Sequence, residues 1–250
     1  EYGRDGGDSR SAANIPLVAV GVKICRDALR PRLRRDQVPP MSGERIEGAA
    51  LETRGKLVSV VCLSILVALA YSESMDNGFT FDDRAIILQN PLVGEQRWQE
   101  IFSSAYWQGV TGVAEGLYRP ITVATYALNH AFSGANPALY HFVNLIIHLV
   151  VAGTLFALSR SHLSMPASFV AGILFALHPA LSEAVNSVVG RAELLAAGFA
   201  LSAVWTWKGI SPGNRLGVGL GVGTFFLLLA AQLAKESGLD IKPGKTGLLW

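Results

Sequence analysis

The chain has 250 residues, of which 50% are hydrophobic and only 16% are charged, whereas soluble domains usually carry about 25% charged residues. The apolar residues gather into long uncharged blocks, and the two cysteines lie far apart, which excludes a disordered chain, a coiled coil and a small disulfide scaffold. The net charge of +2 excludes little by itself. We therefore predict an all-α fold, a polytopic transmembrane helical bundle.

The two ends of the chain differ in composition from the rest. Residues 1–56 contain 11 Lys and Arg residues, which predicts a cytosolic, basic and disordered leader. Within it, Met41 opens a plausible leader for the first span, so we expect residues 1–40 to be a disordered tail or sequence outside the natural reading frame. Residues 239–250 form a Gly- and Lys-containing polar tail, where the chain looks truncated. We expect no nucleic-acid partner.

Apolar stretches predict the membrane spans. A helix needs about 20 mainly apolar residues to cross the bilayer, and five stretches qualify or nearly do, so we predict about five spans. The first stretch has a competing interpretation as a cleaved signal, because Ala68-Leu69-Ala70 resembles a signal-peptidase site. The five stretches are, in chain order, Leu57–Tyr71, Phe142–Ser159, Ala167–Leu181, Leu194–Trp207 and Leu216–Ala234.

Charge distribution predicts the orientation of these spans. The leader carries 11 basic residues, whereas residues 72–120 carry 3 basic and 7 acidic ones. Since Lys and Arg near span ends favour the cytosol, we expect a cytosolic N-terminus and a long first luminal loop over residues 72–140. The turns at 160–166 and 208–215 then lie in the cytosol. The predicted protein is a multi-pass membrane protein.

Polar residues that the bilayer penalises gather at one end of the predicted spans. On the second span His141, Asn144 and His148 are spaced i, i+3 and i+7, so they face one side of the helix, which must contact protein or water. The predicted orientation places nearly all the costly residues at luminal span ends or in luminal loops. This predicts a site at the luminal rim. The residues concerned are Asp82, Asp83, Tyr118, Arg119, His141, Asn144, His148, His178, Glu183, Arg191, Glu193, Lys235 and Glu236.

Each of these residues also has a structural interpretation. The pair Asp82-Asp83 fits a solvated turn or a helix cap, and Arg119 fits an anchor at the lipid headgroups. His148 fits an interhelical hydrogen bond. His178-Pro179 fits a simple end to the third span, because proline breaks the helical hydrogen-bond ladder.

The residue types at this rim suit one chemistry. No nucleotide-binding loop, zinc-protease helix or nucleophile elbow is present in the sequence. A carboxylate outside the membrane, near basic groups and an apolar mouth, suits an enzyme that uses a lipid-linked phosphate donor. The aspartate would take a proton from an attacking hydroxyl, and cationic groups would stabilise the leaving phosphate.

A series of short motifs over about residues 41–238 resembles one known family. That family is the transmembrane and tetratricopeptide-repeat-containing proteins, O-mannosyltransferases of the endoplasmic reticulum with the GT-C type of membrane fold. The motifs are Phe81-Asp82-Asp83, Asn90-Pro91, Leu117-Tyr118-Arg119-Pro120, Tyr140-His141-Phe142-Val143-Asn144, His148, Leu177-His178-Pro179, Glu183-Ala184-Val185, Gly190-Arg191-Ala192-Glu193 and Ala234-Lys235-Glu236.

The resemblance implies a location in the endoplasmic-reticulum membrane and an activity. The expected donor is dolichyl-phosphate mannose, and the expected acceptors are Ser and Thr hydroxyls of secretory-pathway proteins, cadherins among them. It also implies an acidic catalytic motif in the first luminal loop, which falls on Asp82 and Asp83. No cofactor is expected.

The other rim residues receive supporting roles. We expect donor-phosphate contacts from Arg119, Arg191 and Lys235. No metal is required, although Asp82, Asp83 and Glu183 could hold a divalent cation if the fold brought them together. Groups that support the site or contact the acceptor are expected at Tyr118, His141, Asn144, His148, His178, Glu183 and Glu236.

The chain departs from the family in two ways. The family has about twice as many spans and an array of tetratricopeptide repeats, whereas this chain shows no 34-residue helical repeat. We therefore expect the isolated chain to be inactive. The alternative function is a non-catalytic adaptor or regulator of the endoplasmic-reticulum membrane that binds luminal or calcium-handling partners. A cavity around the acidic motif favours the enzyme, and a convex loop favours the adaptor.

Overall fold

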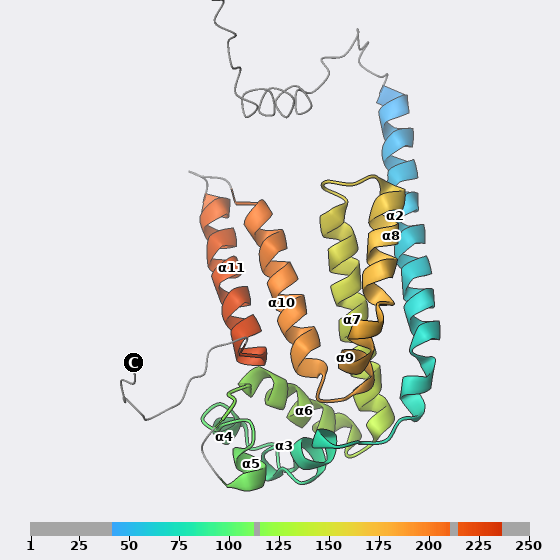
Figure 1. The fold of residues 1–250 in the computed structure, drawn as a ribbon. Coiled ribbons are helices and arrows are strands. Elements are labelled where there is room, and N and C mark those ends of the chain that lie inside the picture. The colour runs from blue at the N-terminus through green and yellow to red at the C-terminus, as the bar shows by residue number, and fades with distance from the viewer. Residues whose placement is uncertain (1–41, 113–115, 211–214, 237–250) are drawn as a thin grey trace, which may run out of the picture. The chain divides into compact units, whose positions relative to one another are not determined.

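The computed structural model describes residues 42–112, 116–210 and 215–236. All regular secondary structure in these ranges is helical, which confirms the predicted all-α bundle. The chain divides into two compact units, Glu1–Leu51 and Glu52–Trp250, and the second unit holds the helices that matter below (Figure 1). The predicted segments 1–40 and 239–250 lie outside the described residues.

Among the described residues, three helices are long and apolar enough to cross a membrane, or four if one bent pair is a single span, compared with the five spans predicted. The predicted span Leu194–Trp207 lies in α10 (Arg191–Lys208), which does not qualify as a span because its 18 residues include three charged side chains near its ends. The helical segments Met165–Ala176 and Pro179–Asn186, at 49° to each other, form a fourth span only if together they cross the membrane. The three continuous spans are Glu47–Ala70 in α2 (Ser42–Ala70), α7 (Pro137–Ser159) and Leu216–Ala234 in α11 (Arg215–Ala234).

The first span begins earlier than predicted. Helix α2 starts at Ser42 and runs unbroken to Ala70. Glu52 and Lys56 stand one turn apart on it and pair at 2.9 Å, an arrangement that favours helix. The prediction of disorder is therefore wrong for residues 42–56, which extend the span toward its N-terminal side.

The third predicted span is broken where proline stands. Helix α8 (Met165–Ala176) ends before His178-Pro179, and the chain continues through η3 (Pro179–Leu181) and α9 (Ser182–Asn186). The break leaves the Ala176 carbonyl without a partner in its own helix. This oxygen accepts the Tyr71 hydroxyl at 3.2 Å and contacts His148 Nε2 at 2.9 Å. One carbonyl thus joins α8 to α7 and to the end of α2.

The long first loop is a folded layer of short helices. Two Asn-Pro pairs start helices within or after it, because Asn90 and Asn136 accept the main-chain N–H groups of Leu92 and Ala138 while proline occupies the first helical position. The elements of the loop are η1 (Ser72–Asp76), η2 (Arg84–Leu88), α3 (Pro91–Gly94), α4 (Trp98–Ile101), α5 (Gln108–Thr111) and α6 (Pro120–Ser133).

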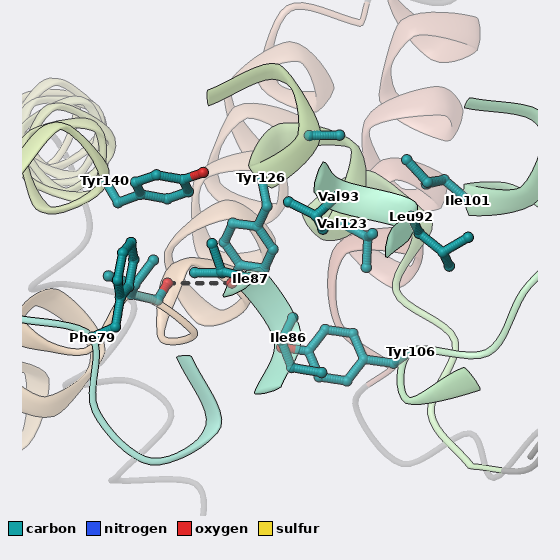
Figure 2. Close-up of a cluster of buried hydrophobic side chains, with 12 residues drawn as sticks. Phe79, Ile86, Ile87, Leu92, Val93, Ile101, Tyr106, Val123, Tyr126 and Tyr140 are labelled. Carbon is teal, nitrogen blue, oxygen red and sulfur yellow. Dashed lines mark hydrogen bonds between the residues drawn. The ribbon is translucent and has the colours of Figure 1, made fainter. Parts of the chain in front are cut away.

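This layer has its own apolar core, which continues into the bundle (Figure 2). Tyr126 from α6 is fully buried, and its hydroxyl donates to the Val188 carbonyl at 3.2 Å. The rings of Phe79 and Tyr140 meet edge to face, with centroids 5.3 Å apart. Because Tyr140 belongs to α7 and Val188 to the turn after α9, the loop is fixed to the end of the bundle.

The bundle within residues 52–236 has two distinct ends (Figure 1). Helix α10 lies beside α7 and α11, and the hydroxyls of Thr206 and Thr224 lie 2.7 Å apart between α10 and α11. We call the end with residues 72–136 and the turn 187–190 the loop end. The opposite end, with residues 160–164 and 208–210, is the turn end.

Candidate active site

The two aspartates of the acidic motif have different surroundings. Asp83 is fully buried, and its Oδ2 accepts the Thr80 N–H at 3.1 Å and lies 3.4 Å from the Thr80 hydroxyl. Its Oδ1 accepts the main-chain N–H of Val189 at 2.8 Å. Both oxygens are therefore engaged. Asp83 ties the first loop to the turn between α9 and α10.

Asp82 is exposed and lines a cavity of about 210 Å³ at the loop end. The residue before it, Phe81, has a φ of +40° and is 94% exposed. A side chain is strained in this region of backbone space, by about 1–3 kcal/mol. Of the two neighbouring carboxylates, only that of Asp82 lines the cavity.

The cavity joins the first loop to α9 and α10. Its walls carry three carboxylates, those of Asp82, Glu183 and Glu193, and the guanidinium of Arg119. The backbone packs closely at Gly190, where an added Cβ would lie 2.4 Å from the Ala184 carbonyl oxygen. The complete lining is Asp82, Tyr106, Trp107, Leu117, Arg119, Glu183, Ala184, Ser187, Val189, Gly190 and Glu193.

Arg119 is the cation of this cavity. Its Nε donates to Glu236 Oε1 at 3.2 Å, and its side chain is only 16% exposed. The guanidinium also lies over the Tyr106 ring, 5.1 Å from the centroid. Burial raises the pKa of Tyr106 to about 12, although the charge of Arg119 opposes this rise. The positive charge is thus held in place by an aromatic ring and a carboxylate.

A second cavity adjoins the first at Glu193. Lys235 Nζ donates to Glu193 Oε1 at 2.7 Å, and both residues line a groove of about 390 Å³ between α10 and α11. The groove continues along the apolar faces of the two helices. Its other lining residues are Ala196, Ala197, Ala200, Leu228, Ala231 and Gln232.

Arg191 lies in the interior and does not line either cavity. Its Nε donates to Asn144 at 2.8 Å, and its remaining bonds go to Asn129, to the Tyr140 carbonyl and to the Thr125 carbonyl at 3.0 to 3.3 Å. The rings of two tyrosines, at positions 126 and 140, lie 5.0 and 5.6 Å from its guanidinium. In this structure Arg191 joins α6, α7 and α10.

The polar stripe predicted on α7 faces protein, as expected, but not the cavity. Asn144 is buried and donates to the carbonyls of Ser187 and Val188 at 2.9 and 3.3 Å. His148 binds the Ala176 carbonyl and lies edge to face with Tyr71. His141 is 1% exposed, and neither ring nitrogen has a hydrogen-bond partner among the described residues. These side chains position the turn and the helices.

The remaining predicted residues divide between the cavity and its surroundings. Glu183 lines the cavity with Asp82, and Glu236 binds Arg119. Tyr118 donates to the Phe102 carbonyl at 2.7 Å, within the loop layer. His178 is exposed, and its Nδ1 accepts the Ala180 N–H at 3.1 Å as the cap of η3.

The fold does not assemble the cation site that Asp82, Asp83 and Glu183 would form. Asp83 is turned toward Val189, so that only Asp82 and Glu183 share the cavity. No group of three or more His, Cys, Asp or Glu side chains in the described part of the chain is placed to hold a metal ion.

Two residues to which the sequence analysis assigned no role also shape this site. Glu193 links the two cavities, and Tyr106 supports Arg119. The sequence carried a signal for Glu193, since it stands two residues after Arg191 at a span end. Nothing in the sequence marked Tyr106, because its contact with Arg119, 13 positions later, depends on how the loop folds.

Comparison with known proteins gives relatives of one kind. The mouse protein O-mannosyl-transferase TMTC3 is 36% identical over 202 residues, which is 78% of this chain and 22% of that protein. The human protein O-mannosyl-transferases TMTC2 and TMTC4 are 33% and 32% identical, each over 74% of this chain. The chain belongs to the TMTC family. It spans between 22% and 27% of the length of these three TMTC proteins.

Two further comparisons gave no match. No protein-family model matches the chain, and no solved structure matches it. These three relatives are named as protein O-mannosyl-transferases.

Proposed function

We propose that this TMTC chain forms part of a membrane glycosyltransferase that moves mannose from dolichyl-phosphate mannose to Ser or Thr hydroxyls of secretory-pathway proteins. The observation that carries the proposal is the exposed carboxylate of Asp82 in one cavity with Arg119, adjoining an apolar groove at Glu193. The relatives' names give the reaction class, and the two cavities supply the chemistry and a place for a lipid.

Asp82 is the proposed base. The acceptor hydroxyl oxygen would attack the anomeric carbon of mannose while the bond from that carbon to the phosphate oxygen breaks. The hydroxyl proton would pass to the Asp82 carboxylate, and dolichyl phosphate would leave. A general base acts only within hydrogen-bond reach of the proton that it takes, which favours the cavity-lining Asp82 over the buried Asp83.

Arg119 and Lys235 are the proposed phosphate contacts. The leaving phosphate gains negative charge as its bond to the sugar breaks, and cations placed near it stabilise that charge. Each of the two cations contacts a carboxylate, Glu236 and Glu193 respectively. These carboxylates hold the cations at the cavity rim. The buried contacts of Arg191 lead us to assign it the positioning of the 187–190 turn.

The groove between α10 and α11 is the proposed seat of the polyprenyl chain near the phosphate. We expect Ala200→Trp to raise the donor KM about tenfold, since each methylene excluded from an apolar site costs ~0.8 kcal/mol. The measurement is mannosyl transfer by a full-length protein that carries this segment, at varied dolichyl-phosphate mannose. The matched control is Val204→Trp, on α10 but outside the groove lining. Equal KM values for the two variants would contradict the seat.

The proposal also requires the loop end to face the lumen of the endoplasmic reticulum. Single cysteines replace Phe102 or Leu163, which are 54% and 44% exposed, in a chain whose Cys25 and Cys62 are changed to Ala. In sealed microsomes, a membrane-impermeant maleimide should modify Leu163→Cys at once and Phe102→Cys only after permeabilisation. The reverse pattern would place Asp82 in the cytosol and refute the proposed reaction.

The adaptor alternative makes a different prediction for the same site. A loop that only binds partners needs no free carboxylate in a cavity, whereas the transferase does. The concave surface around Asp82 therefore favours the enzyme.

A further inference from the structure

A separate cavity of about 270 Å³ opens at the turn end of the bundle. It lies between the last turns of α7 and α10, whereas the cavity lined by Asp82 lies at the loop end. None of its lining residues belongs to the candidate active site. They are Ala157, Leu158, Ser161, Trp205, Lys208 and Gly209.

The mouth of this cavity carries the ammonium group of Lys208. Its Nζ donates to the Ser161 hydroxyl and lies 3.3 Å from His162 Nε2, and the Ser161 hydroxyl itself donates to the Leu158 carbonyl at 2.6 Å. No carboxylate in the described part of the chain pairs with Lys208, whereas Lys56 and Arg160 both pair with Glu52. Ser161 and His162 hold the Lys208 ammonium at the mouth, and no ion pair with a carboxylate offsets its charge among the described residues. This arrangement fits an anion.

The walls of the cavity are apolar. Ala157 and Leu158 lie on the α7 side, and the Trp205 indole, which is 50% exposed, lies on the α10 side. Trp is enriched at the level of the lipid headgroups, where one edge of the ring is apolar and the other wet. A ligand that fills both the mouth and the walls must therefore be amphipathic, with an anionic head and a hydrocarbon tail.

We propose that this cavity binds an anionic phospholipid, with its headgroup phosphate at the Lys208 ammonium, which Ser161 and His162 hold in place. One acyl chain would lie against Ala157, Leu158 and Trp205. Basic pockets between membrane helices are known to hold anionic headgroups. The predicted orientation places this end in the cytosolic leaflet, which is rich in anionic lipid. Free phosphate would fill the mouth alone and leave the apolar walls uncovered.

Native mass spectrometry of the purified 250-residue chain tests the proposal. The chain in detergent is incubated with equal amounts of phosphatidylserine and phosphatidylcholine that differ in mass, and the lipids retained are counted. The wild type should retain phosphatidylserine in excess. Lys208→Gln should lower that excess about fivefold, the change expected for one lysine at an anionic lipid surface, and Lys208→Arg should preserve it.

Two controls distinguish lipid binding at this cavity from binding elsewhere on the chain and from binding of a free anion. Lys56→Gln removes a charge that pairs with Glu52 and does not line the cavity, so it should leave the excess unchanged. A wild type without a preference, or an equal loss in Lys56→Gln and Lys208→Gln, would overturn the proposal. Displacement of the serine lipid by millimolar inorganic phosphate would also overturn it, because the occupant would then be a free anion.

Discussion

Asp82→Asn is expected to reduce mannosyl transfer by about 10²–10⁴-fold, which is what a positioned general base contributes. The variant keeps the size and hydrogen-bonding capacity of the side chain but cannot take the proton of the acceptor hydroxyl. Because Asp82 is exposed at the cavity, thermal stability should be unchanged. The measurement is transfer from dolichyl-phosphate mannose to an acceptor peptide by a full-length protein that carries this segment.

The neighbouring aspartate supplies the sharpest contrast. The buried Asp83 carboxylate accepts hydrogen bonds from the N–H groups of Thr80 and Val189. In Asp83→Asn, the amide NH2 group would face one of these two N–H donors, and that hydrogen bond would be lost. We expect a loss of about 1–3 kcal/mol in stability, the usual cost of leaving a buried polar group unpaired. Asp76 is an exposed carboxylate of the same loop. The Asp76→Asn variant should therefore change neither mannosyl transfer nor stability. Full mannosyl transfer by the Asp82→Asn variant would contradict the assignment of Asp82 as the base.

Arg191→Met is expected to lower the stability of the bundle by several kcal/mol, because each buried polar group left unpaired costs about 1–3 kcal/mol. The substitution leaves Asn144, Asn129 and the Tyr140 carbonyl without their shared donor. Since these groups come from α6 and α7, the loop layer should loosen from the bundle. Thermal unfolding in detergent, followed by tryptophan fluorescence, measures the effect.

Arg191→Lys provides the matched comparison. A lysine keeps the charge but cannot reach the amides of Asn144 and Asn129 and the main-chain oxygens together, because it lacks the planar fork. We expect an unfolding temperature between those of the wild type and Arg191→Met. If Arg191→Met instead unfolds at the wild-type temperature and loses only donor binding, Arg191 contacts the donor phosphate after all.

Local signals in the sequence anticipated much of the architecture. Each of the three continuous spans overlaps a predicted apolar block, and α8 stops just before the predicted break at His178-Pro179. Proline and the amide caps act over one turn of chain, so their effects can be predicted without tertiary structure. The start of α2 was harder to predict, because helical propensity in residues 42–56 outweighs their polar composition.

The different surroundings of Asp82 and Asp83 could not be predicted. Asp82 and Asp83 are adjacent and identical, and what distinguishes them is the positive φ of Phe81 and an N–H donor at Val189, 106 residues away. The buried position of Arg191 could not be predicted for a similar reason. An arginine at a span end usually meets lipid headgroups, but here partners from α6 and α7 surround it.

The carbonyl freed at the end of α8 has a consequence for biosynthesis. Tyr71 and His148 are made long before residue 176, yet both find their partner in the Ala176 oxygen. During translation the first two transmembrane segments therefore lack this common tether until the third has left the ribosome and entered the bilayer. The hydrogen bonds that join these two segments through Ala176 therefore form only after the later segment arrives, whereas the ring contact between Tyr71 and His148 does not depend on it.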